Sequence, residues 1–368
     1  MELELSDDQE FFLETTRKFL RSEAPLPVVR ELENEPAGFT ADYWRRGADL
    51  GWTLMLVPEA DGGGSLSEHG LLDLVLVAEA MGALVSPGPL GPVNVVAAAV
   101  ARSGTDEQRS AVLPGLLSGA KVAAWCGVEP VTATLDGDRI MLRGSVAAVE
   151  AGAQAAHLLV VVDTADGVTQ VLVPADAAGL VVTPLEGLDL VRRFASVTFD
   201  DVALPVSAVL GAVGTAVADV EHQLQIACVL QAAETCGAMD RVFEMTLEYL
   251  GDRYSFGRPL SSYQALKHRI ADDKTWLEAC HATAGAAARA VAVGSPDAHE
   301  LVSVAKRWIG PHATELVQDC VQLHGGIGVT WEHDLHLYLR RVTVNRVTHG
   351  TPEWHGERIA ALSLGTTS

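Results

Sequence analysis

The chain has 368 residues, of which 48% are hydrophobic, so it can bury one large core or several smaller ones. Its 48 acidic residues outnumber its 26 basic ones, and the net charge of −22 argues against a nucleic-acid or anionic-membrane partner, which would need clustered positive charge. Because the sequence has no apolar run of about 20 residues and begins without a signal-peptide pattern, we expect a cytoplasmic protein with no membrane insertion.

Helical patterns dominate the first 120 residues. Ser6 and Gln9 have the spacing of a capping box, so the first helix should begin near Asp7 and end before Pro25. We therefore expect a helical N-terminal domain over residues 1–120. Its further predicted helices lie at 40–51, 66–83 and 105–118, with a Pro/Gly-rich stretch at 86–92.

Strand-like patterns begin at residue 121. Two Asp-Gly pairs, Asp136-Gly137 and Asp166-Gly167, are typical of hairpin turns. Together with short β-branched segments, they predict a middle β domain over residues 121–208. The predicted strands lie at 122–128, 139–142, 158–162, 168–173 and 195–202.

Long amphipathic patterns return after Pro205. Helices of this length, joined by short polar turns, predict a C-terminal four-helix bundle over residues 209–368. We expect Pro311 to kink the third helix, because proline removes a helix hydrogen bond. The four helices are predicted at 214–252, 262–293, 297–324 and 334–346.

The cysteines are odd in number and lack the paired spacing of a zinc site. We therefore expect neither a disulfide framework nor a metal site, and interpret all five as buried reduced thiols. They are Cys126, Cys228, Cys236, Cys280 and Cys320.

Two C-terminal segments are the most informative motifs. The first reads Arg253-Tyr-Ser-Phe256-Gly257-Arg258 and is followed by Gln264, and the second reads Gln322-Leu-His-Gly325-Gly326. With the order of helices, β domain and helices, they resemble the acyl-CoA dehydrogenase family over nearly the whole chain. The resemblance implies an α+β fold with a helical N-terminal domain, a middle β-barrel domain and a C-terminal four-helix bundle.

Shorter segments agree with this resemblance. They are Val57-Pro58-Glu59, Glu129-Pro130, and Thr330-Trp331-Glu332-His333-Asp334 leading to Arg340-Arg341. The last of them resembles the branch of the family that acts on bulky acyl-CoAs, including those with steroid side chains. The resemblance implies an acyl-CoA substrate, FAD as the hydride acceptor, a carboxylate that removes the α proton, and an electron-transfer acceptor for the reduced flavin.

The family shares each FAD between two subunits, and the part that one subunit lends to its neighbour is intact here. Arg253 matches the arginine that faces the pyrophosphate, and Phe256 matches the aromatic residue beside it. Gln322, Gly325 and Gly326 match the loop on the adenosine side. Arginine suits this role because it stays charged and binds phosphate oxygens in pairs, and glycine lets a backbone come close to a diphosphate.

The part that a subunit keeps for its own flavin differs from the family pattern. Ala148-Val149-Glu150 stands where the family commonly has Trp-Ile-Thr or Trp-Ile-Ser facing the flavin ring, and Val128 replaces the usual threonine before Glu129-Pro130. Glu150 would bring a negative charge towards an electron-rich reduced flavin, which should disfavour that flavin.

Neither family position for the catalytic base holds a carboxylate. The two positions are His349, which precedes Gly350-Thr351, and Ala227, and Cys228 stands at the position of a CoA-facing arginine. Alanine cannot take a proton, whereas histidine titrates near neutral pH. Glu234 lies two helical turns after Ala227 on the same face, although pairing within the bundle is its simpler role. We therefore assign no catalytic residue.

These differences predict a non-catalytic β subunit of a heteromeric FAD-dependent acyl-CoA dehydrogenase. It would complete the FAD site of a paralogous subunit in a heterotetramer with two copies of each, acting on a bulky acyl-CoA such as one with a steroid side chain. Two alternatives stay open. One is a self-sufficient homotetramer with His349 or Glu234 as the base, and the other is a structural or CoA-sensing paralogue without flavin.

Overall fold

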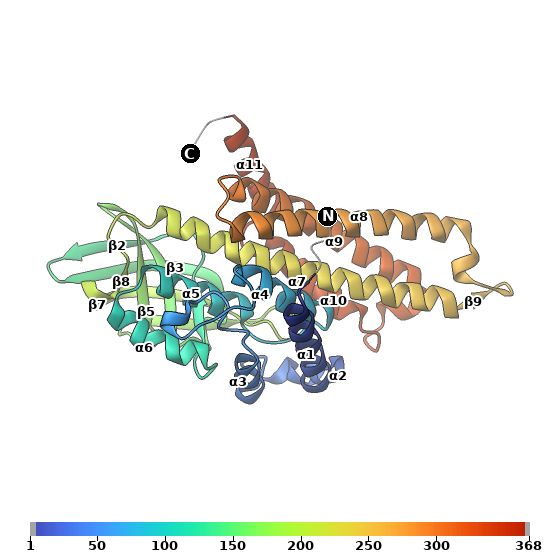
Figure 1. The fold of residues 1–368 in the computed structure, drawn as a ribbon, viewed down its shortest axis with the longest axis horizontal. Helices are drawn as coiled ribbons and strands as arrows, with labels where there is room; N and C mark the ends of the chain where they lie inside the picture. The colour runs from blue at the N-terminus through green and yellow to red at the C-terminus, as the bar shows by residue number, and fades with distance from the viewer. Residues whose placement is uncertain (1–4, 365–368) are drawn as a thin grey trace. The chain divides into compact units, whose positions relative to one another are not determined.

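The computed structural model describes residues 5–364 (Figure 1). The chain divides into two compact units. The helical unit comprises the described residues within Met1–Val29, Val75–Ser86 and Cys228–Ser368, and the sheet unit comprises Arg30–Leu74 and Pro87–Ala227. The predicted boundaries of three domains, at 120/121 and 208/209, stay predictions.

The helices before the sheet follow the predicted pattern with three differences, of which the first is a short helix at Leu26–Glu31 that was not predicted. The predicted capping box begins the first helix, because the Oγ of Ser6 accepts the N–H of Gln9 at 3.3 Å and the Gln9 side chain accepts the N–H of Ser6 at 3.1 Å. The six helices are α1 (Asp7–Glu23), α2 (Leu26–Glu31), α3 (Ala41–Asp49), α4 (Gly70–Ala83), α5 (Leu90–Ser103) and α6 (Asp106–Leu117).

The other two differences have local causes. Helix α4 begins at Gly70 rather than at residue 66, because the carboxylate of Asp73 accepts the N–H groups of Leu66 and Ser67, both at 2.9 Å, and holds this segment in a loop. Helix α5 was not predicted, since prolines at its start resemble a loop. Proline is tolerated in a first helical turn, where its missing N–H has no helical partner.

The sheet unit contains eight strands in one hydrogen-bonded sheet, in the order β6-β7-β3-β2-β4-β5-β8, with β1 paired to β4. Hairpins form at both predicted turns, β2–β3 at Asp136-Gly137 and β4–β5 at Asp166-Gly167. The strands are β1 (Ala123–Trp125), β2 (Val131–Asp136), β3 (Arg139–Glu150), β4 (His157–Thr164), β5 (Gly167–Pro174), β6 (Leu180–Leu185), β7 (Phe194–Pro205) and β8 (Val209–Leu210).

The core of the sheet unit comes from alternating residues of these strands. Ile140, Leu142, Leu158, Val160 and Phe199 are each at most 2% exposed. Strand β6 was not predicted, because four of its six residues are exposed and its alternation of apolar and polar residues is weak. The predicted middle β domain is thus present, with two further strands, β2 and β8, that are also absent from the prediction.

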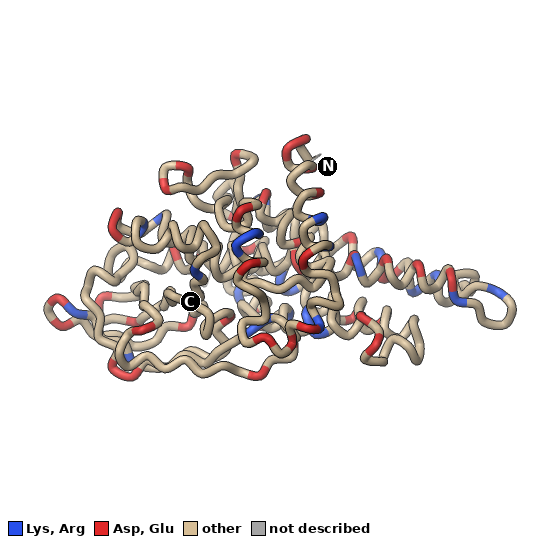
Figure 2. The backbone as a smooth tube through the Cα atoms, turned by 90° about the horizontal axis from the view of Figure 1, so that it is seen from below, with Lys and Arg blue, Asp and Glu red and all other residues tan. Residues whose placement is uncertain are grey.

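The helical unit contains the four predicted C-terminal helices and one more. The predicted four are α7 (Val217–Asp252, of which residues 228–252 belong to this unit), α8 (Gln264–Ala292), α9 (Ala298–His324) and α10 (Leu335–Val347), and the fifth is α11 (Pro352–Ser363). Helix α9 continues through Pro311 and packs against α8, α10 and α11. Figure 2 shows acidic residues spread along the chain with basic residues between them. Within residues 5–364, no helix combines the length and apolar character needed to cross a membrane.

Helices α4 and α7 cross with their backbones in contact. A Cβ atom added to Gly82 would lie 1.9 Å from the carbonyl oxygen of Glu234, and one added to Gly237 would lie 2.0 Å from that of Glu79. Real Cβ contacts are never this short, so only glycine fits at either position. The crossing therefore fixes the spacing of two helices that carry acidic side chains.

We predict that Gly237→Ala lowers the free energy of unfolding by about 1–3 kcal/mol, because the added methyl group forces the two backbones apart. Gly251→Ala is the matched control on the same helix, since a Cβ atom there meets open space. It should leave stability unchanged or raise it by up to about 1 kcal/mol. Urea unfolding of both variants and the parent measures this, and equal stability of the two variants would contradict the role of the crossing.

Candidate functional site

The first candidate motif forms a hairpin at the end of α7, where Figure 1 labels β9. Arg253 directly follows the helix, and the short strands β9 (Tyr254–Ser255) and β10 (Arg258–Pro259) pair beyond it. Phe256 occupies the turn between them with a φ of 50° and 98% of its surface exposed.

Contacts within the hairpin keep it in one shape. The hydroxyl of Tyr263 donates to the carbonyl oxygen of Ser255 at 2.8 Å, and the guanidinium of Arg258 lies 3.9 Å from the centre of the Tyr263 ring. The N–H of Leu260 donates to the carbonyl of Arg253 at 2.8 Å. The guanidinium of Arg253 is exposed, and among residues 5–364 it forms no ion pair, so the surface salt bridge that could explain this arginine is not observed.

The second candidate motif lies at the end of α9. Gln322, Gly325 and Gly326 are exposed, and a Cβ atom added to either glycine would meet open space. Gly325 ends the helix with a φ of 63°, a conformation that favours glycine, and leads into the 3-10 helix η5 (Gly325–Val329). The backbone here is therefore open to close approach by a ligand.

One contact brings the two motifs together. The hydroxyl of Tyr249 donates to the carbonyl oxygen of His324 at 3.1 Å, and their rings stack at 4.4 Å between centres. Tyr249 lies about one helical turn before Arg253, and His324 directly precedes Gly325. The five candidate residues thus lie at one end of the helical unit, facing outwards. Exposed apolar side chains continue this surface at Ile327, Val329 and Trp331.

The segment at the family's flavin-ring position forms a bulge in β3. Its pairing with β7 shifts register between Val146 and Val149, and Ala148 has a φ of 55°. Glu150 brings a carboxylate to this position, and that carboxylate is paired with a cation. Its carboxylate lies 3.2 Å from the guanidinium of Arg192, and both side chains are only 11–12% exposed, so arginine neutralises the charge. Sequence patterns could not predict this pair because it joins a strand to a distant loop.

One of the two base positions lies in a helix and the other in a turn. Ala227 is buried in α7 at 3% exposure. His349 lies half-buried in the turn between α10 and α11 with a φ of 61°, which is unusual for a residue with a side chain. Its carbonyl oxygen accepts hydrogen bonds from the Nε2 of His355 at 3.0 Å and from the Sγ of Cys228 at 3.8 Å. Backbone contacts therefore hold the turn in which His349 stands.

Lys306 is a further buried group beneath this turn, and sequence analysis missed it. Its ammonium donates to the carbonyl oxygens of Asn345 at 2.9 Å and Thr348 at 2.8 Å, and to the side chain of Gln231. These bonds cap the end of α10. Burial lowers the pKa of Lys306 to about 8 and that of His355 to about 4. The sequence signal that could have identified it is a single lysine on an otherwise apolar helix face.

Glu234 pairs within the bundle, which is the simpler of the two roles considered for it. Its carboxylate accepts the guanidinium of Arg341 at 2.7 Å and the amide of Asn345 at 2.9 Å. The side chains of Arg341 and Glu234 are 1% and 9% exposed. Arg341 also donates to the carbonyl oxygen of Ser86. A carboxylate held in this way is not available to remove a proton from a substrate.

We predict that Arg341→Met lowers the free energy of unfolding by about 3–5 kcal/mol, because it leaves the Glu234 carboxylate buried without its cation. Adding Glu234→Gln should recover part of this loss. Arg45→Met removes an exposed ion pair with Asp42 and should cost less than about 1 kcal/mol. Chemical denaturation compares them, and an equal loss in the two arginine variants would refute the role of the buried pair.

We predict that Lys306 makes stability depend on alkaline pH. Its pKa falls from 10.5 to about 8 on folding, so between these values the unfolded chain binds more protons and stability rises with pH. As the pH rises from about 8 to 10.5, the free energy of unfolding of the parent should increase relative to that of Lys306→Met by on the order of 3 kcal/mol. Thermal or urea unfolding at several pH values measures it, and a difference that stays constant with pH would contradict the shifted lysine.

Comparisons with known proteins identify the family of the chain. The model for the acyl-CoA dehydrogenase N-terminal domain matches residues 6–120, and the model for the acyl-CoA dehydrogenase C-terminal domain matches residues 214–364. Acyl-CoA dehydrogenase IpdE2 of Mycolicibacterium smegmatis is 28% identical over 361 residues, which is 97% of this chain and 99% of that protein.

Two solved structures are similar over nearly their whole length. A variant of the Tcur3481-Tcur3483 steroid ACAD is 30% identical, with a TM-score of 0.89 over 98% of this chain and 99% of that one. The ChsE4-ChsE5 complex from Mycobacterium tuberculosis gives a TM-score of 0.91 over 100% of both chains, and at 24% identity it shows the fold. The chain belongs to the acyl-CoA dehydrogenase family.

Proposed function

We propose that this chain is the non-catalytic β subunit of a heteromeric FAD-dependent acyl-CoA dehydrogenase. The observation that carries the proposal is the outward position of Arg253, Phe256, Gln322 and the Gly325-Gly326 backbone at one end of the helical unit. These groups form half of a site, because nothing within residues 5–364 covers Phe256. A second chain would supply the other half.

The residues at this end fit the tail of FAD. Arg253 is permanently charged and has no ion-pair partner among the described residues, so it is free to bind a diphosphate. The glycine backbone at 325–326 is open to close approach, and Gln322 offers both a donor and an acceptor to an adenosine. FAD bound there would supply the hydride acceptor for a reaction whose proton-abstracting carboxylate belongs to the partner.

The positions at which the family places the catalytic base and the flavin ring fit a catalytic role poorly in this chain. Neither His349 nor Ala227 is a carboxylate, and Glu234 is held by Arg341 and Asn345. At the family's flavin-ring position, an ion pair between Glu150 and Arg192 replaces neutral donors. The self-sufficient homotetramer is disfavoured for this reason.

The relatives support the nature of the partner and substrate. Two of the similar structures are named for two proteins each, and one of them is called a steroid ACAD. We therefore propose a paralogous acyl-CoA dehydrogenase subunit as the partner in a heterotetramer. We propose a bulky acyl-CoA, such as one with a steroid side chain, as its substrate, and an electron-transfer acceptor for the reduced flavin.

We predict that Arg253→Ala weakens FAD retention by the co-purified complex about ten- to a hundredfold, because a charged hydrogen bond to phosphate contributes about 1.5–3 kcal/mol. Subunit assembly should persist. Arg289→Ala is the matched control. It removes an exposed arginine near the far end of α8, away from the hairpin in the sequence. Flavin absorbance per heterodimer after gel filtration measures the effect.

Unchanged flavin content in Arg253→Ala, with the complex intact, would refute the assignment of the hairpin to FAD binding. An equal loss in Arg289→Ala would indicate a general charge effect rather than a contact with the cofactor.

A further inference from the structure

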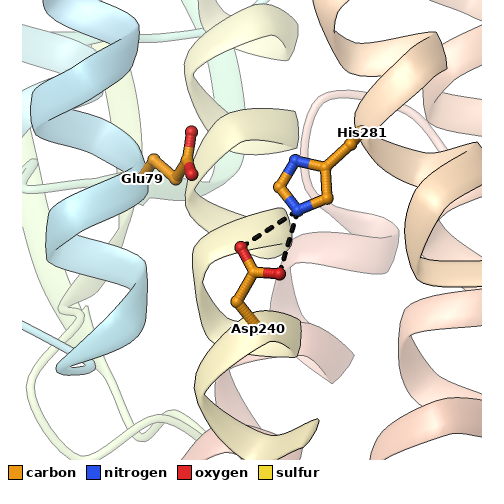
Figure 3. Close-up of side chains that lie close together, drawn as sticks. All are labelled: Glu79, Asp240 and His281. Atoms are coloured by element: carbon orange, nitrogen blue, oxygen red, sulfur yellow. Dashed lines mark hydrogen bonds and ion pairs between the residues drawn. The ribbon is translucent and has the colours of Figure 1, made fainter. Parts of the chain in front are cut away.

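Three side chains with metal-binding groups meet inside the helical unit (Figure 3). Glu79 comes from α4, Asp240 from α7 and His281 from α8. The Nε2 of His281 lies 3.0 Å from each carboxylate oxygen of Asp240. One ligand atom from each of the three residues lies within 4.8 Å of the other two. Among the described residues, no other group of three such side chains is this close.

The backbone holds these residues in place. The carbonyl group of Glu79 sits against Gly237, which lies almost one turn before Asp240 on α7. The close crossing of α4 and α7 therefore sets the distance from which Glu79 and Asp240 reach towards each other. His281 approaches both from a third helix, as Figure 3 shows. A preformed group on rigid helices loses little freedom when it binds an ion.

The charges in this cluster are incompletely balanced. With His281 neutral, the two carboxylates carry a formal charge of −2, which one divalent cation neutralises. Burial raises the pKa of Glu79 because it disfavours the charged carboxylate, and the hydrogen bond to the Asp240 carboxylate raises the pKa of His281. Arg17 and Glu278 are the nearby charges that act on Glu79 and on His281.

Two buried cysteines lie near the cluster and do not join it as ligands. Burial raises the pKa of Cys280 to about 12 and the pKa of Cys236 well above its ordinary value. Neither sulfur belongs to the group of ligand atoms that lie within 4.8 Å of one another, so the cysteines are not counted as ligands. The ligand set is one imidazole nitrogen and two carboxylates, which suits zinc and similar ions better than calcium or magnesium.

We propose that Glu79, Asp240 and His281 form a binding site for one divalent transition-metal ion. In a tetrahedral zinc site, with bonds of about 2.0 Å, neighbouring ligand atoms lie roughly 3.3 Å apart. The 3.0 Å between His281 and Asp240 is close to this spacing, and the Glu79 carboxylate, which lies within 4.8 Å of the other ligand atoms, would move closer when the ion binds. Water takes the fourth position. The ion would join α4, α7 and α8 and is independent of the FAD site.

Binding to the protonated form of His281 displaces a proton. When His281 is protonated, its Nε2–H points at Asp240 and occupies the lone pair that the ion needs. Forming the nitrogen–metal bond breaks that N–H bond and releases one proton to solvent for each ion bound. The apparent affinity therefore increases with pH until His281 is neutral.

The test is zinc titration of the full-length chain, made metal-free by dialysis against a chelator and followed by calorimetry. We expect one ion per chain, and at least a tenfold loss of affinity in His281→Ala. Glu79→Gln keeps the side-chain size and provides a second variant that should fold. His268→Ala removes an exposed histidine from the same helix and should leave affinity unchanged. Circular dichroism establishes that each variant is folded.

Cobalt gives an independent reading, because its visible absorption reports four-coordinate nitrogen and oxygen ligands. The parent and His268→Ala should give the same spectrum, and His281→Ala should lose it. No saturable binding by the parent, or the same affinity in the parent and in folded Glu79→Gln and His281→Ala, would overturn the proposal. Loss of binding in His268→Ala instead would assign the ion to the surface and also overturn it.

Discussion

The backbone contact between α4 and α7 is the constraint on which the helical unit depends. Gly82 and Gly237 let the helices touch, and each faces the carbonyl group of an acidic residue on the other helix, Glu234 or Glu79. The crossing therefore sets where two carboxylates enter the bundle. One of them forms the buried ion pair with Arg341 on α10, and the other joins the cluster with α8. A methyl group at the crossing would disturb both sets of contacts.

This arrangement separates internal charges from the charge offered to a ligand. The buried carboxylate of Glu234 pairs with Arg341 of the same unit, and Lys306 caps the end of α10. Arg253 stands outside this network on a stiff, exposed hairpin. A buried ion pair stabilises a particular arrangement of helices, whereas an exposed arginine without an ion-pair partner is available to a phosphate. The same chain thus combines a fixed interior with half of a binding site.

Sequence patterns predicted what local physics determines. The capping box at Ser6, the Asp-Gly hairpins and the long amphipathic helices all formed where expected. Helix α5 was missed because prolines mask its first turn, and strand β6 because its exposed positions weaken the alternation. For the site, contiguous motifs located the hairpin and the glycine loop. Contacts between residues distant in sequence, such as Glu150 with Arg192 or Asp240 with His281, depend on tertiary packing and left no pattern to detect.

The central claim is that this chain completes a flavin site on a partner and holds no flavin of its own. The most direct test is the FAD-to-protein ratio and native mass of the chain purified alone, and again after co-expression with a paralogue that carries the catalytic glutamate. The account predicts a flavin-free chain alone, and a heterotetramer with one FAD per heterodimer after co-expression. A tetramer of this chain alone that binds one FAD per subunit would contradict it.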